Sequence, residues 1–445
     1  MVDAPPPSTM ARQATKSFLS KGAPIFVTDV ICVPVRAGFF VDDQAAILAG
    51  VDHDGFNYVG DPVTPGFTAI RQAGEAVSVL LLLDDGQVAH GDCAAVQYSG
   101  VGGRDAVFNA SAAIESIEAS VAPMLRGKEV LDFRTMAESV DSLIVDGHRL
   151  HTAIRYGVTQ ALLDAVAKSR GLTMAEIVRD EYQTGIEIVP VPMFVQSGDD
   201  RYNNVDKMVL KEADVLPHGL TNHVETKLGR DGEILAEYVA WVRDRILTLR
   251  TRADYAPLLH FDVYGTIGLA FNGDIERSAD YLVTLGEIAK PFRLRVEHVI
   301  DGGSREGQVS CSAALRAALV MRGSEVQIVV DEWCNSLEDI EIFVAAGAAD
   351  VIHVKMPDLG GVNNTIEALL LIARNGLLAY CGGTCNETDR SAQVSAQIAM
   401  ACGAAQVLAK PGMGVDEGMM IVGNEMARVT ALVAAHANSR VIGGV

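Results

Sequence analysis

The sequence lacks any apolar run approaching the ~20 residues that a helix needs to cross a bilayer. It is also poor in basic residues, since 36 Lys and Arg stand against 57 Asp and Glu, for a net charge of −21. Nucleic acids and anionic membrane surfaces are bound through basic faces. We therefore expect no nucleic-acid partner and no membrane partner. The chain has 445 residues, of which 49% are hydrophobic, so it is long enough for two domains.

Cysteines are few and show no pairing pattern. There are seven of them, an odd number, and no pair has zinc-site spacing, Cys381-x-x-x-Cys385 included. This excludes a disulfide framework and indicates a reducing, cytoplasmic location. Residues 1–22 contain Pro5-Pro6-Pro7 and little Arg, which favours a disordered tail over an organelle-targeting peptide.

The first half of the chain has antiparallel features. Residues 25–35 are β-prone, and the runs 77–83 and 88–96 flank Asp84-Asp85-Gly86, a hairpin signal. Apolar residues at 150, 154, 158, 162 and 166 predict an amphipathic helix. Residues 23–184 are therefore predicted to form an α+β domain. The Gly-rich segment 98–105 has no following Lys-Ser/Thr, so we expect a lid over an active site rather than a phosphate loop.

From about residue 185 the pattern changes to strands alternating with helices. Strands are predicted at 186–194, 218–227, 258–263, 294–299, 328–332, 351–355, 377–381 and 404–408, and helices between them, for example at 232–249 and 275–289, with a last helix at 416–435. Parallel strands need such long crossovers. Residues 185–445 are therefore predicted to form an α/β fold, a (β/α)₈ barrel of the TIM type.

Three of these predicted strands end in a carboxylate. Asp262, Glu297 and Asp331 follow one another at spacings of 35 and 34 residues, and Lys355 ends the next strand. A lone Asp after a strand is usually a helix cap or a turn residue, but strand ends of a barrel converge at one mouth. Three anions there need a cation, and an all-oxygen set suits Mg²⁺ or Mn²⁺. Lys355 beside such a metal would have its pKa lowered toward that of a general base.

Longer runs surround these residues and the other strand ends. They are Gln196-Ser-Gly-Asp-Asp-Arg-Tyr202, Lys211-Glu-Ala-Asp-Val-Leu-Pro-His218, His260-Phe-Asp-Val-Tyr-Gly-Thr266, Asp331-Glu-Trp-Cys-Asn335, Lys355-Met-Pro-Asp-Leu-Gly-Gly-Val-Asn-Asn364, Cys381-Gly-Gly-Thr-Cys-Asn-Glu-Thr388 and Lys410-Pro-Gly-Met-Gly-Val-Asp-Glu-Gly418. The order Asp, Glu, Asp, Lys behind an α+β domain resembles the enolase superfamily, and the runs resemble its methylaspartate ammonia-lyase family. The likeness extends from about residue 25 to the last helix.

The resemblance implies an activity and a set of roles. The family reversibly eliminates ammonia from (2S,3S)-3-methylaspartate to give mesaconate, through removal of the C3 proton and a metal-stabilised enediolate. By position, Asp262, Glu297 and Asp331 match the metal ligands, Lys355 the base, and His218 the group on the opposite face of the substrate.

The resemblance extends to substrate contacts and to cofactors. Gln196, Thr384 and Cys385 match substrate-binding positions, with the backbone N–H groups of residues 382–385 offered to the second carboxylate. The implied cofactor is Mg²⁺, with Mn²⁺ as a substitute and a monovalent cation such as K⁺ as an addition. The implied partners are a small dicarboxylate amino acid and a second copy of the chain in a homodimer.

The sequence departs from the family pattern at two places. His353 stands where the family has Gln, and His298-Val-Ile-Asp301 where it reads Gly-Pro-Met-Asp. Because His353 shares a strand face with Lys355, we assign it to substrate binding, whereas His298 is expected to be a packed or surface histidine.

Another enolase-type racemase, epimerase or cycloisomerase stays open, since the metal triad serves many reactions. A catalytically dead binding protein is disfavoured because Lys355 and all three ligands are present. Ammonia-lyases of the other known type need an Ala-Ser-Gly tripeptide, which is absent. A nucleophilic Cys385 has no base that the sequence identifies.

Overall fold

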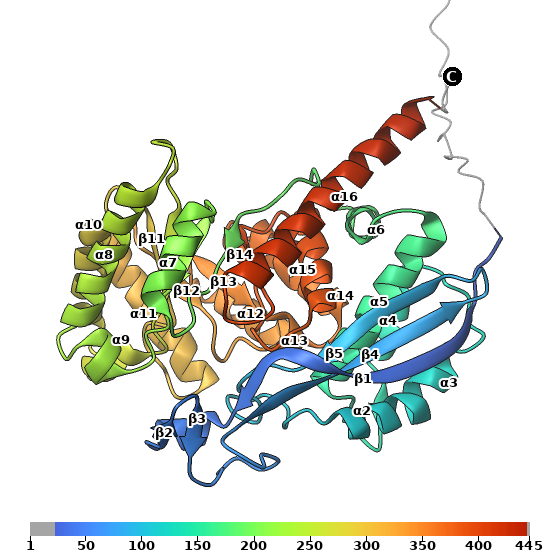
Figure 1. Cartoon of the computed structure of the whole chain (residues 1–445), viewed down its shortest axis with the longest axis horizontal. Coiled ribbons are helices and arrows are strands. Elements are labelled where there is room, and N and C mark those ends of the chain that lie inside the picture. Colours follow the sequence, from blue (N-terminus) through green and yellow to red (C-terminus); the bar gives the residue numbers. More distant parts are fainter. Residues whose placement is uncertain (1–22, 443–445) are drawn as a thin grey trace, which may run out of the picture.

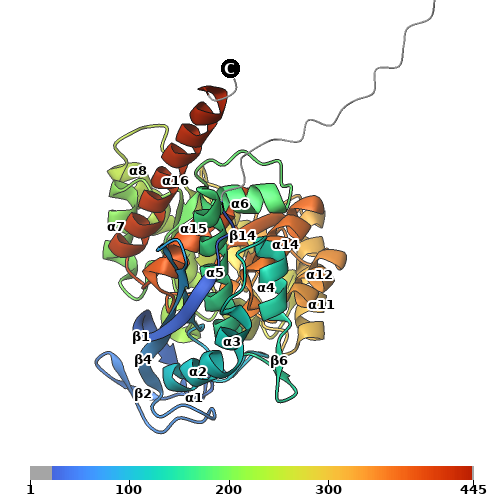
Figure 2. The same ribbon diagram turned by 90° about the vertical axis from the view of Figure 1, so that its right-hand side faces the viewer.

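The computed structural model describes residues 23–442, and the predicted tail at residues 1–22 lies outside them. An antiparallel α+β part lies beside a closed parallel barrel (Figure 1). The C-terminal end of the last helix extends away from both parts, as the view at 90° also shows (Figure 2). Within the described range, no helix is both long and apolar enough to span a membrane.

The α+β part contains a three-stranded sheet in the order β1-β4-β5. Its elements are β1 (Val27–Asp42), α1 (Gln44–Leu48), β2 (Asp52–Asp54), β3 (Asn57–Val59), β4 (Arg71–Leu83), β5 (Val88–Ala94), α2 (Ala110–Ser116), the π-helical turn η1 (Ile117–Val121), α3 (Ala122–Leu125), α4 (Phe133–Asp141), β6 (Ile144–Val145), β7 (His148–Arg149), α5 (Thr152–Arg170) and α6 (Met174–Glu181). Leu82 pairs with Val88, which confirms the predicted hairpin.

Helix α5 joins this sheet to the barrel. A Cβ atom on Gly157 would lie 2.3 Å from the backbone N of Cys93, so only glycine allows α5 to approach β5 this closely. On the barrel side, Thr159 Oγ1 accepts a hydrogen bond from Val362 N at 2.9 Å. The helix is therefore buried along most of its length, and the predicted apolar positions 154, 158, 162 and 166 all lie in the core.

The barrel is closed by eight parallel strands in the order β10-β11-β12-β13-β14-β15-β8-β9, which confirms the predicted fold class. Its elements are β8 (Met193–Phe194), α7 (Arg201–Leu210), β9 (Val215–His218), the π-helical turn η2 (Val224–Leu228), α8 (Glu233–Leu249), β10 (Leu258–Asp262), α9 (Thr266–Ala270), α10 (Ile275–Ala289), β11 (Leu294–Glu297), α11 (Arg305–Met321), β12 (Gln327–Val330), α12 (Leu337–Ala345), β13 (Val351–Val354), α13 (Met356–Leu359), α14 (Val362–Arg374), β14 (Leu378–Cys381), α15 (Asp389–Cys402), β15 (Gln406–Leu408) and α16 (Asp416–Ile442).

The second barrel strand was predicted at residues 218–227, and this prediction is wrong. The strand is Val215–His218, and part of the predicted run forms η2 instead. The strand ends there because His218 and Gly219 have positive φ angles of 69° and 77°, which an extended strand cannot continue through. The correction brings His218 from the start of a strand to its C-terminal end, at the mouth of the barrel.

Side chains fill the barrel interior, as in other closed eight-stranded barrels. They form a buried apolar cluster that closes the floor below the carboxyl ends of the strands: Phe194, Val215, Val329, Val351, Tyr380 and Leu408. At the mouth of the barrel, residues of the α+β part contribute to the wall of the site.

Candidate active site

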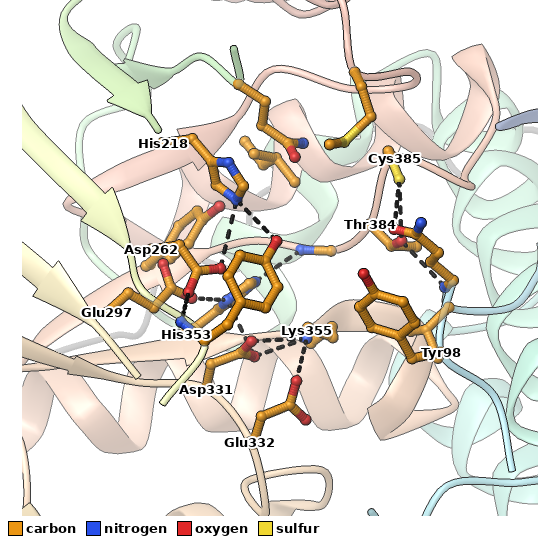
Figure 3. A pocket seen from close by; sticks show the side chains of 18 of the residues that line it. Tyr98, His218, Asp262, Glu297, Asp331, Glu332, His353, Lys355, Thr384 and Cys385 are labelled. Carbon is orange, nitrogen blue, oxygen red and sulfur yellow. Dashed lines mark hydrogen bonds and ion pairs between the residues drawn. The ribbon is translucent and has the colours of Figure 1, made fainter. Parts of the chain in front are cut away.

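The three predicted carboxylates come together at the mouth of the barrel (Figure 3). Asp262 and Glu297 are the last residues of β10 and β11 and are partners in the strand register, and Asp331 directly follows β12. All three side chains are buried and line one small cavity of about 60 Å³. The equal spacing in the sequence therefore does correspond to convergence in space.

The three carboxylates bring negative charges together that the nearby cationic side chains do not fully balance. Burial, and then the charge of Glu297, raise the pKa of Asp262 above its ordinary value. Asp331 Oδ1 is buried and accepts no well-directed hydrogen bond, although Lys355 Nζ lies 2.8 Å and His353 Nδ1 3.2 Å from it. Buried oxygens that repel one another and lack partners are suited to a hard divalent cation.

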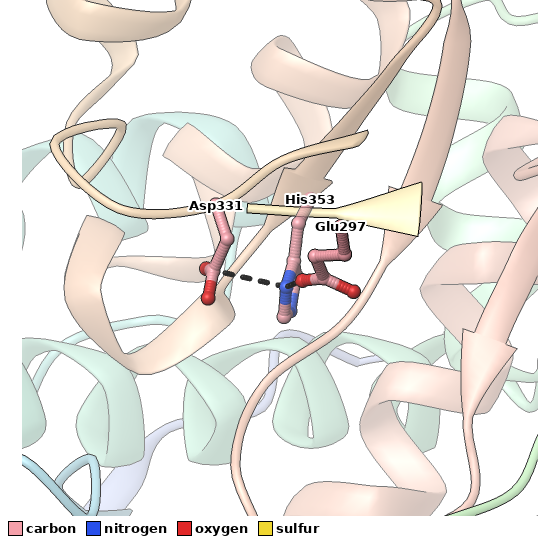
Figure 4. Close-up of side chains that lie close together, drawn as sticks. All are labelled: Glu297, Asp331 and His353. Atoms are coloured by element: carbon pink, nitrogen blue, oxygen red, sulfur yellow. Dashed lines mark hydrogen bonds and ion pairs between the residues drawn. The ribbon is translucent and has the colours of Figure 1, made fainter. Parts of the chain in front are cut away.

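Glu297, Asp331 and His353 have potential ligand atoms that all lie within 4.8 Å of one another (Figure 4). Asp262 is outside this group and lies on the side of His218, whose Nε2 is 3.4 Å from Asp262 Oδ2. The donor set, three carboxylates of which two are already close, fits Mg²⁺.

Two imidazoles contact the oxygens of Glu297. His260 Nε2 lies 2.8 Å from Oε2, and His353 Nδ1 lies 2.7 Å from Oε1. Gln406 Nε2 and Gly383 N donate to the other ring nitrogens, at 3.0 and 3.2 Å. Each histidine must therefore carry its proton on the nitrogen that faces Glu297. Burial opposes ionisation of Glu297, but the two imidazoles outweigh it and hold its pKa well below its ordinary value.

This tautomer bears on the role of His353. A nitrogen that carries a proton cannot ligate a metal, so in this arrangement His353 supports the ligand Glu297 rather than joining the metal set. The ring is stacked on Tyr380 with centroids 4.1 Å apart, and it also lines the cavity. His260 was missed from the sequence, although its place two residues before Asp262, on the same strand face, was an available signal.

Lys355 follows β13 and points into the cavity beside Asp331 (Figure 3). Its Nζ donates to Asp331 Oδ2 at 2.9 Å and lies 3.9 Å from Glu332 Oε1. Burial lowers the pKa of Lys355, but the charges of Asp331 and Glu332 outweigh burial and raise it. The lowered pKa that was expected for Lys355 is thus not found beside the carboxylates alone. A cation bound by these carboxylates would oppose the rise in the Lys355 pKa.

The opposite wall carries His218 and Gln196. His218 Nε2 lies 3.4 Å from both Asp262 Oδ2 and the Tyr264 hydroxyl. Two atoms here, His218 Nδ1 and Gln196 Nε2, are buried without a hydrogen-bond partner. Buried polar groups are nearly always paired in folded proteins, so this wall is built for a polar ligand.

The loop after β14 was expected to offer its backbone N–H groups to the second substrate carboxylate, but most of these groups are already occupied. The N–H groups of Gly382, Gly383 and Thr384 already donate to Val354 O, to His353 Nε2 and to Glu387 Oε1. The prediction that these backbone groups bind a carboxylate is therefore wrong for three of the four residues, because two acceptors from the end of β13 and one from the same loop already occupy them.

The side chains of this loop remain able to bind a ligand. Thr384 Oγ1 accepts from Gln97 N and Asn386 N, and its hydroxyl also makes a long contact of 3.9 Å with Cys385 Sγ. A stronger acceptor in the cavity would compete with the thiol for the hydroxyl proton. The Cys385 thiol lies 3.3 Å from Gln97 Oε1, to which it donates. Burial raises the pKa of Cys385 to about 12, which argues against a thiolate nucleophile.

Further residues of the cavity wall were missed from the sequence. They are Val96, Gln97, Tyr264, Glu332, Tyr380, Leu408 and Met413, whereas Tyr98 and Arg104 lie in segment 98–105, which was predicted to be a lid. Those from the α+β part reach the barrel only through tertiary packing, which local patterns do not encode. His298 is buried, as a packed histidine would be, and does not line the cavity.

The chain matches models of one protein family along nearly its whole length. Residues 25–183 match "Methylaspartate ammonia-lyase N-terminus" and residues 185–435 match "Methylaspartate ammonia-lyase C-terminus". A methylaspartate ammonia-lyase of Clostridium tetanomorphum is 61% identical over 407 residues, which cover 92% of this chain and 98% of the relative.

Solved structures give the same picture. The β-methylaspartase of Clostridium tetanomorphum in its Mg complex superposes with a TM-score of 0.89 at 60% identity, covering 92% of this chain and 100% of that one. The methylaspartate ammonia-lyase of Citrobacter amalonaticus containing (2S,3S)-3-methylaspartic acid superposes with a TM-score of 0.90 at 50% identity, with coverage of 92% and 100%. A muconate lactonizing enzyme of Pseudomonas fluorescens shares the fold, with a TM-score of 0.56 at 19% identity and coverage of 84% of each chain.

Proposed function

Because the chain belongs to the methylaspartate ammonia-lyase family, we propose that its buried carboxylate site is where ammonia is reversibly eliminated from (2S,3S)-3-methylaspartate to give mesaconate. The protein is a carbon–nitrogen lyase. The observation that carries the assignment to this site is the convergence of the buried carboxylates Asp262, Glu297 and Asp331 with the partly buried Lys355 at the mouth of one barrel.

The metal ligands we propose are Asp262, Glu297 and Asp331. When bound there, Mg²⁺ supplies the positive charge that makes the C3 proton of the substrate acidic and stabilises the enediolate. The carboxylates hold this position through their strand-end placement, and His260 and His353 fix the orientation of Glu297. Mn²⁺ is the substitute we propose, and a monovalent cation such as K⁺ the additional ion.

Lys355 is the base in this proposal. Its Nζ lies within the cavity and can take the C3 proton once the amine is neutral. His218 stands on the other wall, next to Asp262 and opposite Lys355, as the base or acid for the opposite face of the substrate. The unpartnered Gln196 Nε2 and the Thr384 hydroxyl supply hydrogen bonds to the second substrate carboxylate, beside Cys385 and His353.

Three features of organisation belong to the same proposal. Residues 23–184 form a capping domain and residues 185–445 the catalytic barrel, supported by the break between the two family models. A homodimer is supported by β1, an edge strand with exposed Ile31, Val33 and Val35. A reducing cytoplasm is supported by the seven cysteines, all of which are free thiols.

Other enolase-type reactions are not supported. The muconate lactonizing enzyme resembles this chain in fold alone, at 19% identity. The decisive assay follows mesaconate by its ultraviolet absorbance, since the elimination creates a double bond conjugated with a carboxylate. We expect absorbance to rise with Mg²⁺ and not after chelation, and full turnover in chelator would contradict the metal role.

A further inference from the structure

Arg104 belongs to the predicted lid, segment 98–105, and lines the active-site cavity. Its guanidinium is buried, with 3% of the side chain exposed, and it donates from Nη2 to Glu332 Oε2 at 2.6 Å and from Nε to Asp358 Oδ2 at 2.8 Å. Glu332 follows β12, and Asp358 lies in α13 after β13. One side chain from the α+β part therefore bridges two neighbouring loops of the catalytic barrel.

The backbone of the lid also forms a hydrogen bond with the barrel loop that follows β12. Asn335 accepts a long hydrogen bond from Arg104 Nη2 at 3.4 Å and donates from Nδ2 to Gly102 O at 2.6 Å. Gly102 has a φ of 61° and Gly103 a φ of 81°, a left-handed backbone that favours glycine. The two glycines shape the turn that carries Arg104 inward.

The carboxylate that Arg104 holds is also next to the proposed base. Glu332 Oε1 lies 3.9 Å from Lys355 Nζ, and the Glu332 carboxylate is a second anion beside this amine in addition to Asp331 (Figure 3). Without Arg104, the partly buried Glu332 and the buried Asp358 would be anions with Lys355 as their nearby cation, a situation that favours a new pairing. The ammonium would then be drawn toward Glu332 and away from the substrate.

Arg104 also stands between two cavities. It lines the small active-site cavity and a second one of about 470 Å³, whose wall includes Thr152, Arg305 and Trp333. Removing the side chain would join the two and admit water beside Lys355.

We propose that Arg104 is a positioning residue for the elimination: by binding Glu332 and Asp358 it closes the 98–105 lid over the site and keeps Lys355 directed at the substrate. The proposal rests on the function proposed above for Lys355. It requires that Arg104 act through its charge and hydrogen bonds rather than by supporting the fold.

Arg104→Ala tests this in the full-length enzyme with Mg²⁺. We expect kcat to fall by about 100-fold, the scale of a misplaced catalytic group, with a smaller change in KM. Guanidinium ion added at sub-denaturing concentration should enter through the enlarged cavity and raise kcat saturably. Arg305→Ala is the matched control, because Arg305 lines the second cavity but pairs with Asp339 at 3.1 Å, and its kcat should neither fall nor respond to guanidinium.

A second variant separates electrostatics from packing. If Arg104 serves to neutralise Glu332, then Arg104→Ala/Glu332→Gln should be faster than Arg104→Ala alone. An Arg104→Ala enzyme within about twofold of the wild-type kcat, or one that neither guanidinium nor Glu332→Gln improves, overturns the proposal.

Should Arg104→Ala fail to fold, Arg104→Lys replaces it, since Lys cannot reach both carboxylates at once. A folded Arg104→Lys with reduced kcat supports the proposal, and one with wild-type kcat overturns it. If the wild-type enzyme forms no mesaconate, the proposed function itself fails, whatever the variants do.

Discussion

Lys410 and Glu387 form an ion pair with no exposed surface, directly behind the loop that carries Thr384 and Cys385. Lys410 Nζ donates to Glu387 Oε1 at 2.7 Å and to Gly382 O at 2.9 Å. Tyr156, from helix α5, donates to Glu387 Oε2 at 2.6 Å. The pair therefore connects the substrate-binding loop to the α+β part.

The change Lys410→Met removes one partner and leaves the other buried. An uncompensated buried carboxylate costs about 3–5 kcal/mol of stability, and the hydrogen bond to Gly382 is lost as well. Lys410→Met/Glu387→Met removes both charges, which is often neutral for stability, but it leaves the Tyr156 hydroxyl and the Thr384 N–H without an acceptor. We expect the double variant to be more stable than Lys410→Met but to bind substrate poorly, because Thr384 has lost its support.

Chemical unfolding monitored by circular dichroism measures the first effect, and KM for methylaspartate the second. Lys207→Met is the matched control, because Lys207 pairs with Asp416 on an exposed surface, where ion pairs contribute little. An unfolding midpoint for Lys410→Met equal to that of the control would refute the stability argument. A double variant with wild-type KM would refute the link to the loop.

Three further predictions concern the cavity itself. Lys355→Ala should abolish reaction of the (2S,3S) isomer while sparing weak activity on (2S,3R), and His218→Ala should do the reverse; equal loss of both isomers in two folded variants would contradict the assignment of faces. His353→Gln should keep Mg²⁺ affinity in titration calorimetry, whereas His353→Leu should lose about 10–100-fold, the scale of supporting contacts to a metal ligand; equal affinities would contradict the role. With the pKa of Cys385 raised to about 12, only about one thiol in ten thousand is ionised at pH 8, so iodoacetamide should not inactivate the enzyme at that pH and should begin to do so only as pH rises.

The metal carboxylates and Lys355 could be predicted because barrel geometry converts equal sequence spacing into convergence. Each βα unit returns the chain to the same rim, so strand-end residues are brought together by local structure alone. His218 could be placed only through the family resemblance, since the predicted strand boundaries put it at the wrong end. Its positive φ is a tertiary feature that strand propensity does not report.

Contacts between the two parts of the chain could not be predicted in the same way. Arg104 and Gln97 both line the cavity, yet each lies more than two hundred positions before its partner, Glu332 and Cys385 respectively. The prediction that the N–H groups of residues 382–384 bind a carboxylate was wrong for a related reason, since it overlooked tertiary contacts. One acceptor of these groups is the side chain of Glu387, which Lys410 and Tyr156 hold in place. A sequence pattern identifies a donor but not whether folding has already satisfied it.

His353 shows how a departure from a family pattern can preserve a function. The position requires a donor toward Glu297 and an acceptor for Gly383 N–H. A neutral imidazole has one of each, and so does the amide of the Gln that the family carries there. The ring needs additional space, because a Cβ atom on Gly382 would lie 1.9 Å from His353 Nε2. The exchange is therefore tolerated only beside a glycine, and Gly382→Ala should impair the His353 enzyme through this clash.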